Sequence, residues 1–376
     1  MLSLKGDSNS RLAKILTVCF CLLTLIVLFR LVGAVLVPQA GSHNPLLPAQ
    51  SSSLGAADSS SALAGVDAKV SQVLQLLQAN PALPAGVQSG LPAGAGTDGA
   101  DMIDRYLTLL ATTLTGIVYR RPVFGAYGGT DDVPLERVPF NEAAAAEGLV
   151  WPDVGHTMVG LKRLANTRLL LETVLKEDIP GDFLEAGVWR GGSCIFARAV
   201  LDVYKSKRLV HVCDSFEGLP AASSVKDNDS WSRVNFLRVA KEQVQEHFKS
   251  YNMLNERVLF HKGFFRDSLP TAPVSQLAVI RADGDMYEST MDILFNLYEK
   301  LSVGGYVVID DWGIPEAQEA VWDFAKWHGF TDDVKNLVRI DQSAIYWKKV
   351  KETKVRMELY QDFNSIRTPG KTAGAQ

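Results

Sequence analysis

A glycine-rich turn after an apolar segment is the first feature of this chain that predicts chemistry. It spans residues 182 to 193 and contains Gly187, Gly191 and Gly192. Residues without a Cβ adopt the dihedral angles of such a turn and let a ligand approach the main chain closely. The pattern is Glu-x-Gly-x-x-x-Gly-Gly, which favours S-adenosylmethionine over a dinucleotide, because dinucleotides are typically bound by Gly-x-Gly-x-x-Gly. An ordinary strand-to-helix turn is the alternative interpretation.

Asp214 strengthens the prediction of a cofactor site. It follows a second apolar segment, residues 209 to 213, and lies 22 residues after Gly192. This is close to the spacing of about 20 residues at which an acidic residue binds the ribose hydroxyls of a nucleotide cofactor. The glycine turn and Asp214 together therefore predict binding of S-adenosylmethionine.

Four further acids follow the ends of two later apolar segments: Asp283, Asp285, Asp310 and Asp311. Ionised carboxylates that pack closely repel one another and lose hydration unless a cation compensates them. Mg²⁺ prefers oxygen ligands and would resolve this conflict. A single aspartate after a strand more often caps the next helix. Four such aspartates, at the ends of two strands that we expect to be neighbours in one sheet, favour a metal site.

The hydrophobic pattern predicts the elements that must bring these residues together. Apolar strand patterns occur at residues 182–186, 209–213, 257–261, 277–282 and 305–309, with weaker ones at 337–340 and 344–347. Helical patterns occur at residues 102–119, 151–175, 231–251, 289–301 and 316–328. Strands that alternate with helices predict an α/β fold with a doubly wound, mostly parallel, Rossmann-like sheet. Ligands bind at the carboxyl ends of the strands in such a sheet.

The N-terminal residues predict a membrane anchor. Residues 15 to 37 are 23 residues with one charge, Arg30, enough to cross a hydrocarbon core of about 30 Å. Three basic residues precede this segment, and no Lys or Arg follows it before Lys69. The positive-inside rule therefore predicts a cytosolic tail, residues 1 to 14, and a lumenal main domain. A cleaved signal peptide is the alternative, although its apolar core is normally about 7 to 15 residues long.

Composition divides the rest of the chain. Residues 38 to 100 are rich in Pro, Ala, Gly and Ser, which predicts a flexible stem. Residues 101 to 350 carry the folded domain, and residues 351 to 376 are expected to form a polar C-terminal tail. A net charge of −4 gives no reason to expect a nucleic-acid partner. Two of the four cysteines lie in the folded part, which does not indicate a disulfide framework. Asn228 begins the only glycosylation sequon.

Four motifs of the folded part, in the same order, resemble the macrocin O-methyltransferase family. They are EAGVWRGG from residue 185, DSFEGLP from 214, IRADGDMYESTM from 280 and GYVVIDD from 305. The similarity extends from about residue 102 to about residue 348 and includes the segment TMVGLKR from Thr157. Members of the family are class I, metal-dependent methyltransferases that act on sugar hydroxyls of macrolide antibiotics. The anchor and the stem are not part of the family's bacterial pattern.

The resemblance implies roles for individual residues. Those implied to contact S-adenosylmethionine are Thr157, Glu185, Gly187, Gly191, Ser193, Asp214, Ser215, Gly263 and Phe264, with Asp214 at the ribose. Those implied to bind Mg²⁺ are Asp283, Asp310 and Asp311. The metal would orient the acceptor hydroxyl and lower its pKa. A carboxylate, Asp283 or Asp285, would take the proton, and the alternatives are His156, His211 and His261.

The anchor and the resemblance together predict methylation of a glycan, or of another hydroxyl-bearing substrate, in the Golgi lumen. A catechol or another small phenol is an alternative acceptor. A Golgi glycosyltransferase is a second interpretation, because an anchor, a stem and Asp283-Gly284-Asp285 also describe an enzyme that binds a nucleotide-sugar through Mn²⁺. Such an enzyme does not require the glycine turn with Asp214. A non-catalytic lumenal binding protein is the third interpretation, and assembly into a homo-oligomer is left open.

Overall fold

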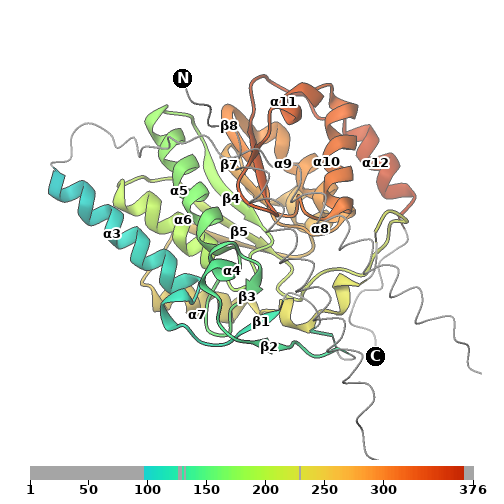
Figure 1. Cartoon of the computed structure of the whole chain (residues 1–376). Helices are drawn as coiled ribbons and strands as arrows, with labels where there is room; N and C mark the ends of the chain where they lie inside the picture. Colours follow the sequence, from blue (N-terminus) through green and yellow to red (C-terminus); the bar gives the residue numbers. More distant parts are fainter. Residues whose placement is uncertain (1–96, 126–128, 131–132, 228–229, 368–376) are drawn as a thin grey trace, which may run out of the picture. The chain divides into compact units, whose positions relative to one another are not determined.

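The computed structural model describes residues 97–125, 129–130, 133–227 and 230–367 (Figure 1). The predicted cytosolic tail, the membrane span and nearly all of the stem lie outside these residues, as does Asn228. Across the described ranges, no helix combines the length and the apolar character needed to span a bilayer. The anchor and the stem therefore stay predictions.

A seven-stranded sheet lies at the centre of the described domain, with its strands in the order β6-β5-β4-β7-β8-β10-β9. Strands β4 to β8 run parallel, whereas β10 runs antiparallel to β8 and to β9. The predicted doubly wound, mostly parallel sheet is confirmed. The strands are β4 Asp182–Ala186, β5 Val210–Asp214, β6 Val258–Lys262, β7 Leu277–Ala282, β8 Leu301–Ile309, β9 Val338–Arg339 and β10 Ile345–Lys348.

The order of the strands explains where a ligand can bind. From β4 the chain moves outward through β5 to β6, and it then returns to place β7 on the other side of β4. The direction of winding therefore reverses between β4 and β7, and the crevice at such a switch point is where doubly wound sheets bind ligands. The glycine turn follows β4 and the first pair of acids follows β7, so both predicted groups of site residues lie at this point.

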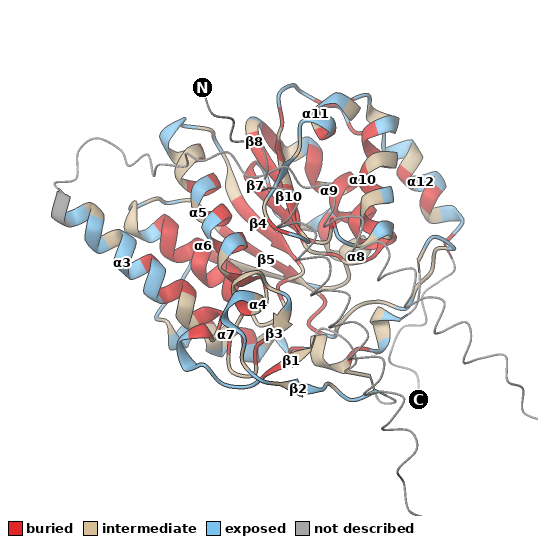
Figure 2. Cartoon of the chain, in the orientation of Figure 1, coloured by how far each residue is buried: buried red, intermediate tan, exposed pale blue. Residues whose placement is uncertain are grey.

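Helices cover both faces of the sheet, and most residues of β4, β5, β7 and β8 are buried, whereas both residues of the edge strand β9 are exposed (Figure 2). Successive side chains of a strand point to opposite faces, so Phe183 belongs to one hydrophobic core and Leu184 to the other. The first core includes side chains of α3 Thr97–Leu114, α5 Gly160–Lys176, α6 Gly192–Val203 and α7 Lys241–Ser250. The second includes side chains of α9 Tyr287–Leu297, α10 Pro315–His328, α11 Thr331–Lys335 and α12 Met357–Ser365, and α8, Phe265–Ser268, packs beside α9.

A small second sheet and a short helix were not predicted from the sequence. The sheet has the order β2-β1-β3, and both pairings are antiparallel. Its strands have only two or three residues each, too few for an alternating pattern to be visible. The elements are β1 Val123–Gly125, β2 Arg137–Val138, β3 Val150–Trp151 and α4 Glu142–Ala146.

Two of the predicted helices have different ends. The helix expected over residues 102 to 119 ends at Leu114, because Gly116 adopts the left-handed backbone, with a φ of 76°. The pattern over residues 151 to 175 forms a helix only from Gly160 onward, and its first residues belong to β3 and a loop. The apolar pattern continues beyond each helix in part because Ile117, in a 3-10 turn, and Trp151, in β3, are also buried.

The helix predicted over residues 231 to 251 is wrong for its first half. Two short 3-10 turns, Trp231–Arg233 and Asn235–Leu237, precede α7. Here the main chain binds other segments: the N–H of Asn235 donates to the carbonyl of Gly129 at 2.8 Å. The carbonyl of Phe236 accepts from the indole N–H of Trp189 at 3.0 Å. These long-range partners compete with the hydrogen bonds of a helix.

Residues 351 to 367 are not the expected polar tail. They include α12, whose Tyr360 and Phe363 are buried against the helices of the second core. These two apolar residues are three positions apart, so they share one face of the helix. Apolar residues recur at helical spacing in this segment, at Val355, Leu359, Phe363 and Ile366, a signal that the prediction of a polar tail missed.

Candidate active site

The glycine turn between β4 and α6 brings the predicted cofactor residues next to the predicted acids. Gly187 has a φ of 91°, and a Cβ at this position would overlap the carbonyl oxygen of Asp283. Glycine is therefore required here for two reasons, the left-handed backbone and the close approach of the chain after β7. Gly191, with a φ of 83°, is the N-cap residue directly before α6.

Asp214 ends β5, and its carboxylate holds the glycine turn. Its Oδ2 accepts a hydrogen bond from the N–H of Val188 at 2.8 Å, and its Oδ1 accepts one from the N–H of Phe216 at 2.7 Å. Burial raises the pKa of Asp214, and these backbone donors oppose the rise. Longer contacts from the N–H of Trp189 at 3.4 Å and from the hydroxyl of Ser215 at 3.5 Å complete the set, and these two weaker donors are the ones that a ribose hydroxyl could replace.

Glu185 is buried below the turn, where its carboxylate has three protein partners. Oε1 accepts from the Ser193 hydroxyl at 2.5 Å and from Nη1 of Arg281 at 2.6 Å. Oε2 accepts from the thiol of Cys194 at 2.8 Å. Burial raises the pKa of Glu185, and the positive charge of Arg281 opposes this. Two predicted cofactor residues, Glu185 and Ser193, therefore contact each other and support the turn from inside the protein.

Three carboxylates gather at the ends of β7 and β8. Asp283, Asp285 and Asp311 each offer one oxygen, and these oxygens lie within 4.8 Å of one another. The N–H of Asp285 also donates to Oδ2 of Asp311 at 2.8 Å. Burial and the negative charge of Asp310 raise the pKa of Asp285 to about 7. Burial and neighbouring carboxylates raise the pKa values of Asp283 and Asp311 well above their usual range.

This group has the chemistry of a site for a hard divalent cation. Its donors are all carboxylate oxygens, which Mg²⁺ prefers, and their mutual repulsion is the kind that a cation relieves. Asp285 has a left-handed backbone, with a φ of 58°, an uncommon conformation for a residue other than glycine. Such conformations cluster at functional sites.

Asp310 lies beside the three carboxylates but has other partners. Its Oδ2 accepts from Nη1 of Arg163 at 2.5 Å, and its Oδ1 is paired with Nη2 of Arg281. Both oxygens thus bind a guanidinium. Of the predicted metal ligands, the structure brings Asp283 and Asp311 together with Asp285, whereas Asp310 pairs with the two arginines.

Arg163 and Arg281 are functional residues that sequence reasoning missed. Arg281 joins Glu185 on the cofactor side to Asp283 and Asp310 on the acid side, with 2.7 Å between its Nη1 and Oδ2 of Asp283. Arg163 joins Asp310 to Asp341, with 2.7 Å between its Nε and Oδ2 of Asp341. An arginine inside the apolar strand β7 was a usable signal, because a buried guanidinium requires anionic partners.

The remaining predicted cofactor residues surround Asp214 and the start of α6. The N–H of Gly263 donates to the carbonyl of Asp214 at 2.9 Å, and Phe264 follows directly, before α8. The hydroxyl of Ser215 donates to the carbonyl of Gly218 at 2.5 Å. Thr157 is buried beside the start of α6, where a Cβ added at Gly192 would lie 2.9 Å from it.

The three candidate histidines have partners away from the carboxylates. Nδ1 of His156 lies 3.1 Å from the hydroxyl of Tyr251. His211 and His261 pair across β5 and β6, with 2.9 Å between Nδ1 of His211 and Nε2 of His261. Burial first, and then a second histidine, lower the pKa values of His156 and His261 to about 4. These contacts are those of structural histidines.

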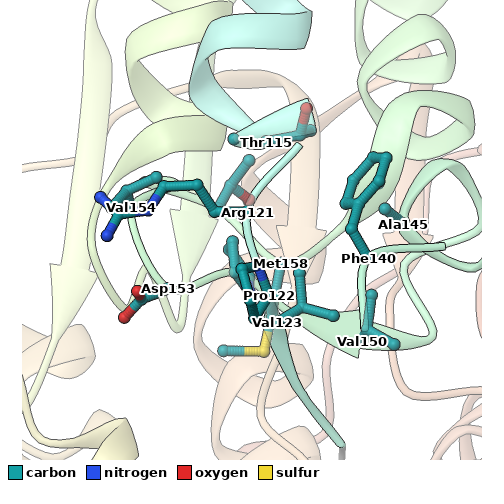
Figure 3. A pocket seen from close by; sticks show the side chains of 14 residues that line it. Thr115, Arg121, Pro122, Val123, Phe140, Ala145, Val150, Asp153, Val154 and Met158 are labelled. Carbon is teal, nitrogen blue, oxygen red and sulfur yellow. The ribbon is translucent and has the colours of Figure 1, made fainter. Parts of the chain in front are cut away.

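A small pocket lies between the end of α3, the small sheet and the start of α5 (Figure 3). It is mainly apolar, with Arg121 and Asp153 among its polar residues. Of the predicted site residues, Thr157 is one that lines it. The labelled residues in Figure 3 are Thr115, Arg121, Pro122, Val123, Phe140, Ala145, Val150, Asp153, Val154 and Met158.

The folded domain matches known proteins over most of its length. Residues 104–349 match the family model described as Macrocin-O-methyltransferase (TylF). The chain is 42% identical over 258 residues to the 8-demethyl-8-(2,3-dimethoxy-alpha-L-rhamnosyl)-tetracenomycin-C 4'-O-methyltransferase of Streptomyces olivaceus, covering 66% of this chain and 94% of that protein. It is 39% identical over 258 residues to the mycinamicin III 3''-O-methyltransferase of Micromonospora griseorubida. This match covers 66% of this chain and 97% of that protein.

One solved structure of similar sequence shares the fold. The O-methyltransferase NovP is 39% identical to this chain and superimposes with a TM-score of 0.60. The match covers 66% of this chain and all of the other. Residues 1–103 lie outside the part of the chain that the family model matches.

Proposed function

Because the chain belongs to the macrocin O-methyltransferase family, we propose that it methylates a sugar hydroxyl, with a divalent metal ion held by aspartates beside the cofactor. The family match covers the domain that carries the site, residues 104–349, and the relatives are O-methyltransferases. The protein is thus an S-adenosylmethionine-dependent O-methyltransferase with a class I fold, as predicted. The glycosyltransferase and the non-catalytic binding protein are not supported.

One observation carries the proposed mechanism: the three carboxylates lie at the switch point of the sheet, next to the glycine turn. The contact between Gly187 and the carbonyl oxygen of Asp283 makes the two groups direct neighbours. A methyl donor above the turn and an acceptor hydroxyl at the carboxylates would therefore meet at short range. Holding two reactants in this way removes most of the entropic cost of their encounter.

The carboxylates would hold the metal ion and accept the proton. We assign the metal to Asp283, Asp285 and Asp311, which the structure groups, rather than to the set with Asp310 that the sequence suggested. When bound, the metal polarises the acceptor oxygen and lowers the pKa of its hydroxyl. An alkyl hydroxyl is a poor nucleophile and gains from this activation. One of these carboxylates, Asp283 or Asp285, would take the proton of the hydroxyl.

Asp214 and the loop after β6 would hold the adenosine part of the cofactor. The carboxylate of Asp214 is already fixed by backbone donors, so a ribose hydroxyl would meet an oriented acceptor. Phe264 lies next to Gly263, whose N–H binds the carbonyl of Asp214, so an aromatic ring lies near the position expected for the adenine.

The names of relatives support a sugar as the acceptor. The Streptomyces olivaceus enzyme acts on a compound that carries a rhamnosyl group. We propose that the acceptor of this chain is a sugar hydroxyl on a glycan in the Golgi lumen. The location rests on the predicted anchor, residues 15 to 37, and the predicted stem. In sealed microsomes, protease should then spare the catalytic domain unless detergent is added. Digestion without detergent would reverse the orientation.

The direct test is methyl transfer by the purified full-length protein. Labelled S-adenosylmethionine would be incubated with glycosides of rhamnose and other sugars and with catechol, with added Mg²⁺ or with a chelator. We expect transfer to a glycoside, lost with chelator and restored by Mg²⁺. In parallel, the glycans of cells lacking the gene should lose the mass of one methyl group on their sugar residues. Methylation of catechol alone, with unchanged glycans, would move the substrate to the phenols.

A further inference from the structure

The segment that follows β5 crosses the carboxyl edge of the sheet and is fastened to the start of α9. We refer to residues 215–227 as the strap. Near its end, the carboxylate of Asp227 accepts from the N–H of Tyr287 at 2.6 Å and from that of Glu288 at 2.9 Å. N–H groups in the first turn of a helix have no carbonyl partner within that helix. Asp227 therefore caps α9 from another part of the chain.

Ser223 provides a second attachment of the strap. Its N–H donates to Oε1 of Glu288 at 2.9 Å, and its hydroxyl donates to Oε2 of the same residue. Lys226 provides a third, with 2.6 Å between its Nζ and Oδ2 of Asp323. The strap therefore has a defined position, and its attachment at Ser223 depends on Glu288, whose side chain is only 1% exposed.

This position places the strap beside the reacting groups. It begins directly after Asp214, on the cofactor side, and its attachment point, Glu288, is three residues after Asp285 in the sequence. The strap thus runs along the edge of the sheet from the cofactor residues to the carboxylates. With the function proposed above, it borders the space in which the acceptor binds.

Glu288 is in turn held by a residue from the C-terminal segment. Arg367 places Nε 2.9 Å and Nη2 2.8 Å from Oε2 of Glu288, and Nη1 2.7 Å from Oδ1 of Asp292. Its Nε also lies 3.1 Å from the hydroxyl of Ser223. The side chain of Arg367 is 4% exposed, so its charge compensates two carboxylates in an interior where they would otherwise be unpaired.

The segment that delivers Arg367 lies beyond the part of the chain that matches the family, which ends at residue 349. The segment is anchored by its own contacts: Phe363 packs against Tyr287 with 5.9 Å between ring centroids, and the hydroxyl of Tyr360 donates to Asp292 at 2.8 Å. Arg367 is therefore held at the end of a packed helix, and it does not depend on the strap for its place.

We propose that Arg367 is a positioning residue, which fixes Glu288 and through it holds the strap as one wall of the acceptor site. The pairing keeps the carboxylate of Glu288 oriented, so that both of its oxygens accept from Ser223. Without the guanidinium, the two buried carboxylates repel each other and turn toward solvent. The attachment at Ser223 is then lost, whereas the glycine turn and Asp214 keep their own hydrogen bonds.

Hydrogen exchange on the full-length protein tests this directly, without any acceptor. Arg367→Met should speed amide exchange in residues 221–227 by about tenfold or more, because the attachment at Ser223 is lost, whereas Phe216 should keep its hydrogen bond to Asp214. Arg367→Lys should restore part of the protection. The matched control is Lys354→Met, which removes an exposed ion pair with Glu299 from the same segment and should leave the strap unchanged. Unchanged exchange of the strap in Arg367→Met would overturn the proposal.

Binding and kinetics separate positioning from a general loss of structure. S-adenosylmethionine affinity, measured by calorimetry, should change less than about twofold in Arg367→Met, since the cofactor contacts do not involve the strap's attachment. With a glycoside acceptor, KM should rise more than kcat falls. If the affinity for S-adenosylmethionine fell by the same factor by which amide exchange in the strap rose, the result would contradict the proposal. Wild-type protein that fails to bind the cofactor would instead refute the proposed function.

A second variant avoids the risk that Arg367→Met does not fold. Ser223→Ala removes only the hydroxyl that donates to Glu288 and keeps the buried ion pair. It should raise strap exchange and the acceptor KM in the same direction as Arg367→Met, by a smaller factor. If Ser223→Ala left both quantities at the wild-type value, the link between Glu288 and the strap would be disproved.

Discussion

The carbonyl oxygen of Asp283 occupies the space that a side chain would take at Gly187. The N–H of Asp283 also donates to the carbonyl of Ala186 at 2.9 Å, so the chain after β7 is fixed against the turn after β4. One backbone contact therefore sets the distance between the cofactor residues and the carboxylates. Any change that separates these two segments will affect both cofactor binding and methyl transfer.

Gly187→Ala should disrupt this contact. The new Cβ would both overlap the carbonyl of Asp283 and strain the left-handed backbone, at a φ of 91°. Gly329→Ala is the matched control, because Gly329 has a φ of 70° but open space around a Cβ. The control should lose about 1 to 2 kcal/mol of unfolding free energy, and Gly187→Ala about 1 to 3 kcal/mol more. Urea unfolding measures the loss of unfolding free energy, and calorimetry measures the affinity for S-adenosylmethionine. Equal losses of unfolding free energy in the two variants would contradict the overlap at Gly187.

The sheet and its ligand edge were predictable from the sequence because parallel strands are buried on both faces. The six residues of β7 are all buried, so they form a continuous apolar run apart from Arg281. Acids mark the site at two of these strands: Asp214 ends β5, and Asp283 follows β7. The periodicity of β9 and β10 was weak but sufficient.

The pairings inside the site could not be predicted, because they join residues far apart in the sequence. Arg163 and Asp310 are 147 positions apart, and no local pattern relates them. The same holds for Arg367 and Glu288, 79 positions apart. Four acids after two strands indicated a charged cluster, but only the folded chain shows which of them arginines neutralise. The family resemblance implied Asp310 as a metal ligand, and the sequence could not show that two arginines pair with it.

Asp214→Ala should weaken S-adenosylmethionine binding by about 1 to 3 kcal/mol, the range for loss of a charged hydrogen bond. Part of the loss would come from the glycine turn, since Val188 loses its acceptor. Asp214→Asn keeps an acceptor oxygen and should lose less. Calorimetry measures the affinity, and Asp332→Ala, at an exposed position, is the control. Wild-type affinity in Asp214→Ala would reject the assigned role.

Metal binding should distinguish the two candidate ligand sets. Mn²⁺ can be followed by electron paramagnetic resonance, which requires neither acceptor nor turnover. Asp285→Asn and Asp311→Asn should each weaken binding by about tenfold or more. Asp310→Asn should retain the metal but lose about 3 to 5 kcal/mol of stability, because two buried arginines lose a shared partner. Loss of the metal in Asp310→Asn, with binding retained in Asp285→Asn, would instead establish the set Asp283, Asp310 and Asp311.

Arg281→Met should be among the most destabilising substitutions in the domain. It leaves Glu185, Asp283 and Asp310 without a shared cation in the interior, which typically costs about 3 to 5 kcal/mol. Arg105→Met removes an exposed ion pair with Asp101 and should cost less than about 1 kcal/mol. Urea unfolding compares the two variants. Similar midpoints would mean that the buried network contributes little to folding.

Two half-buried histidines, His156 and His261, should make folding less favourable in acid. Burial, and then the charge of a neighbouring histidine, lower the pKa values of His156 and His261 from 6.5 to about 4. The unfolded chain therefore binds protons that the folded chain does not, and stability contributed by these residues is lost as the pH falls from 6.5 toward 4. Asp227, whose pKa burial raises to about 6, acts in the opposite direction.

The measurement is consequently a difference: the unfolding free energy at pH 7 minus that at pH 5 should be smaller in His156→Gln and His261→Gln than in the wild type. A difference unchanged by both substitutions would show that these histidines titrate alike in the folded and unfolded chains.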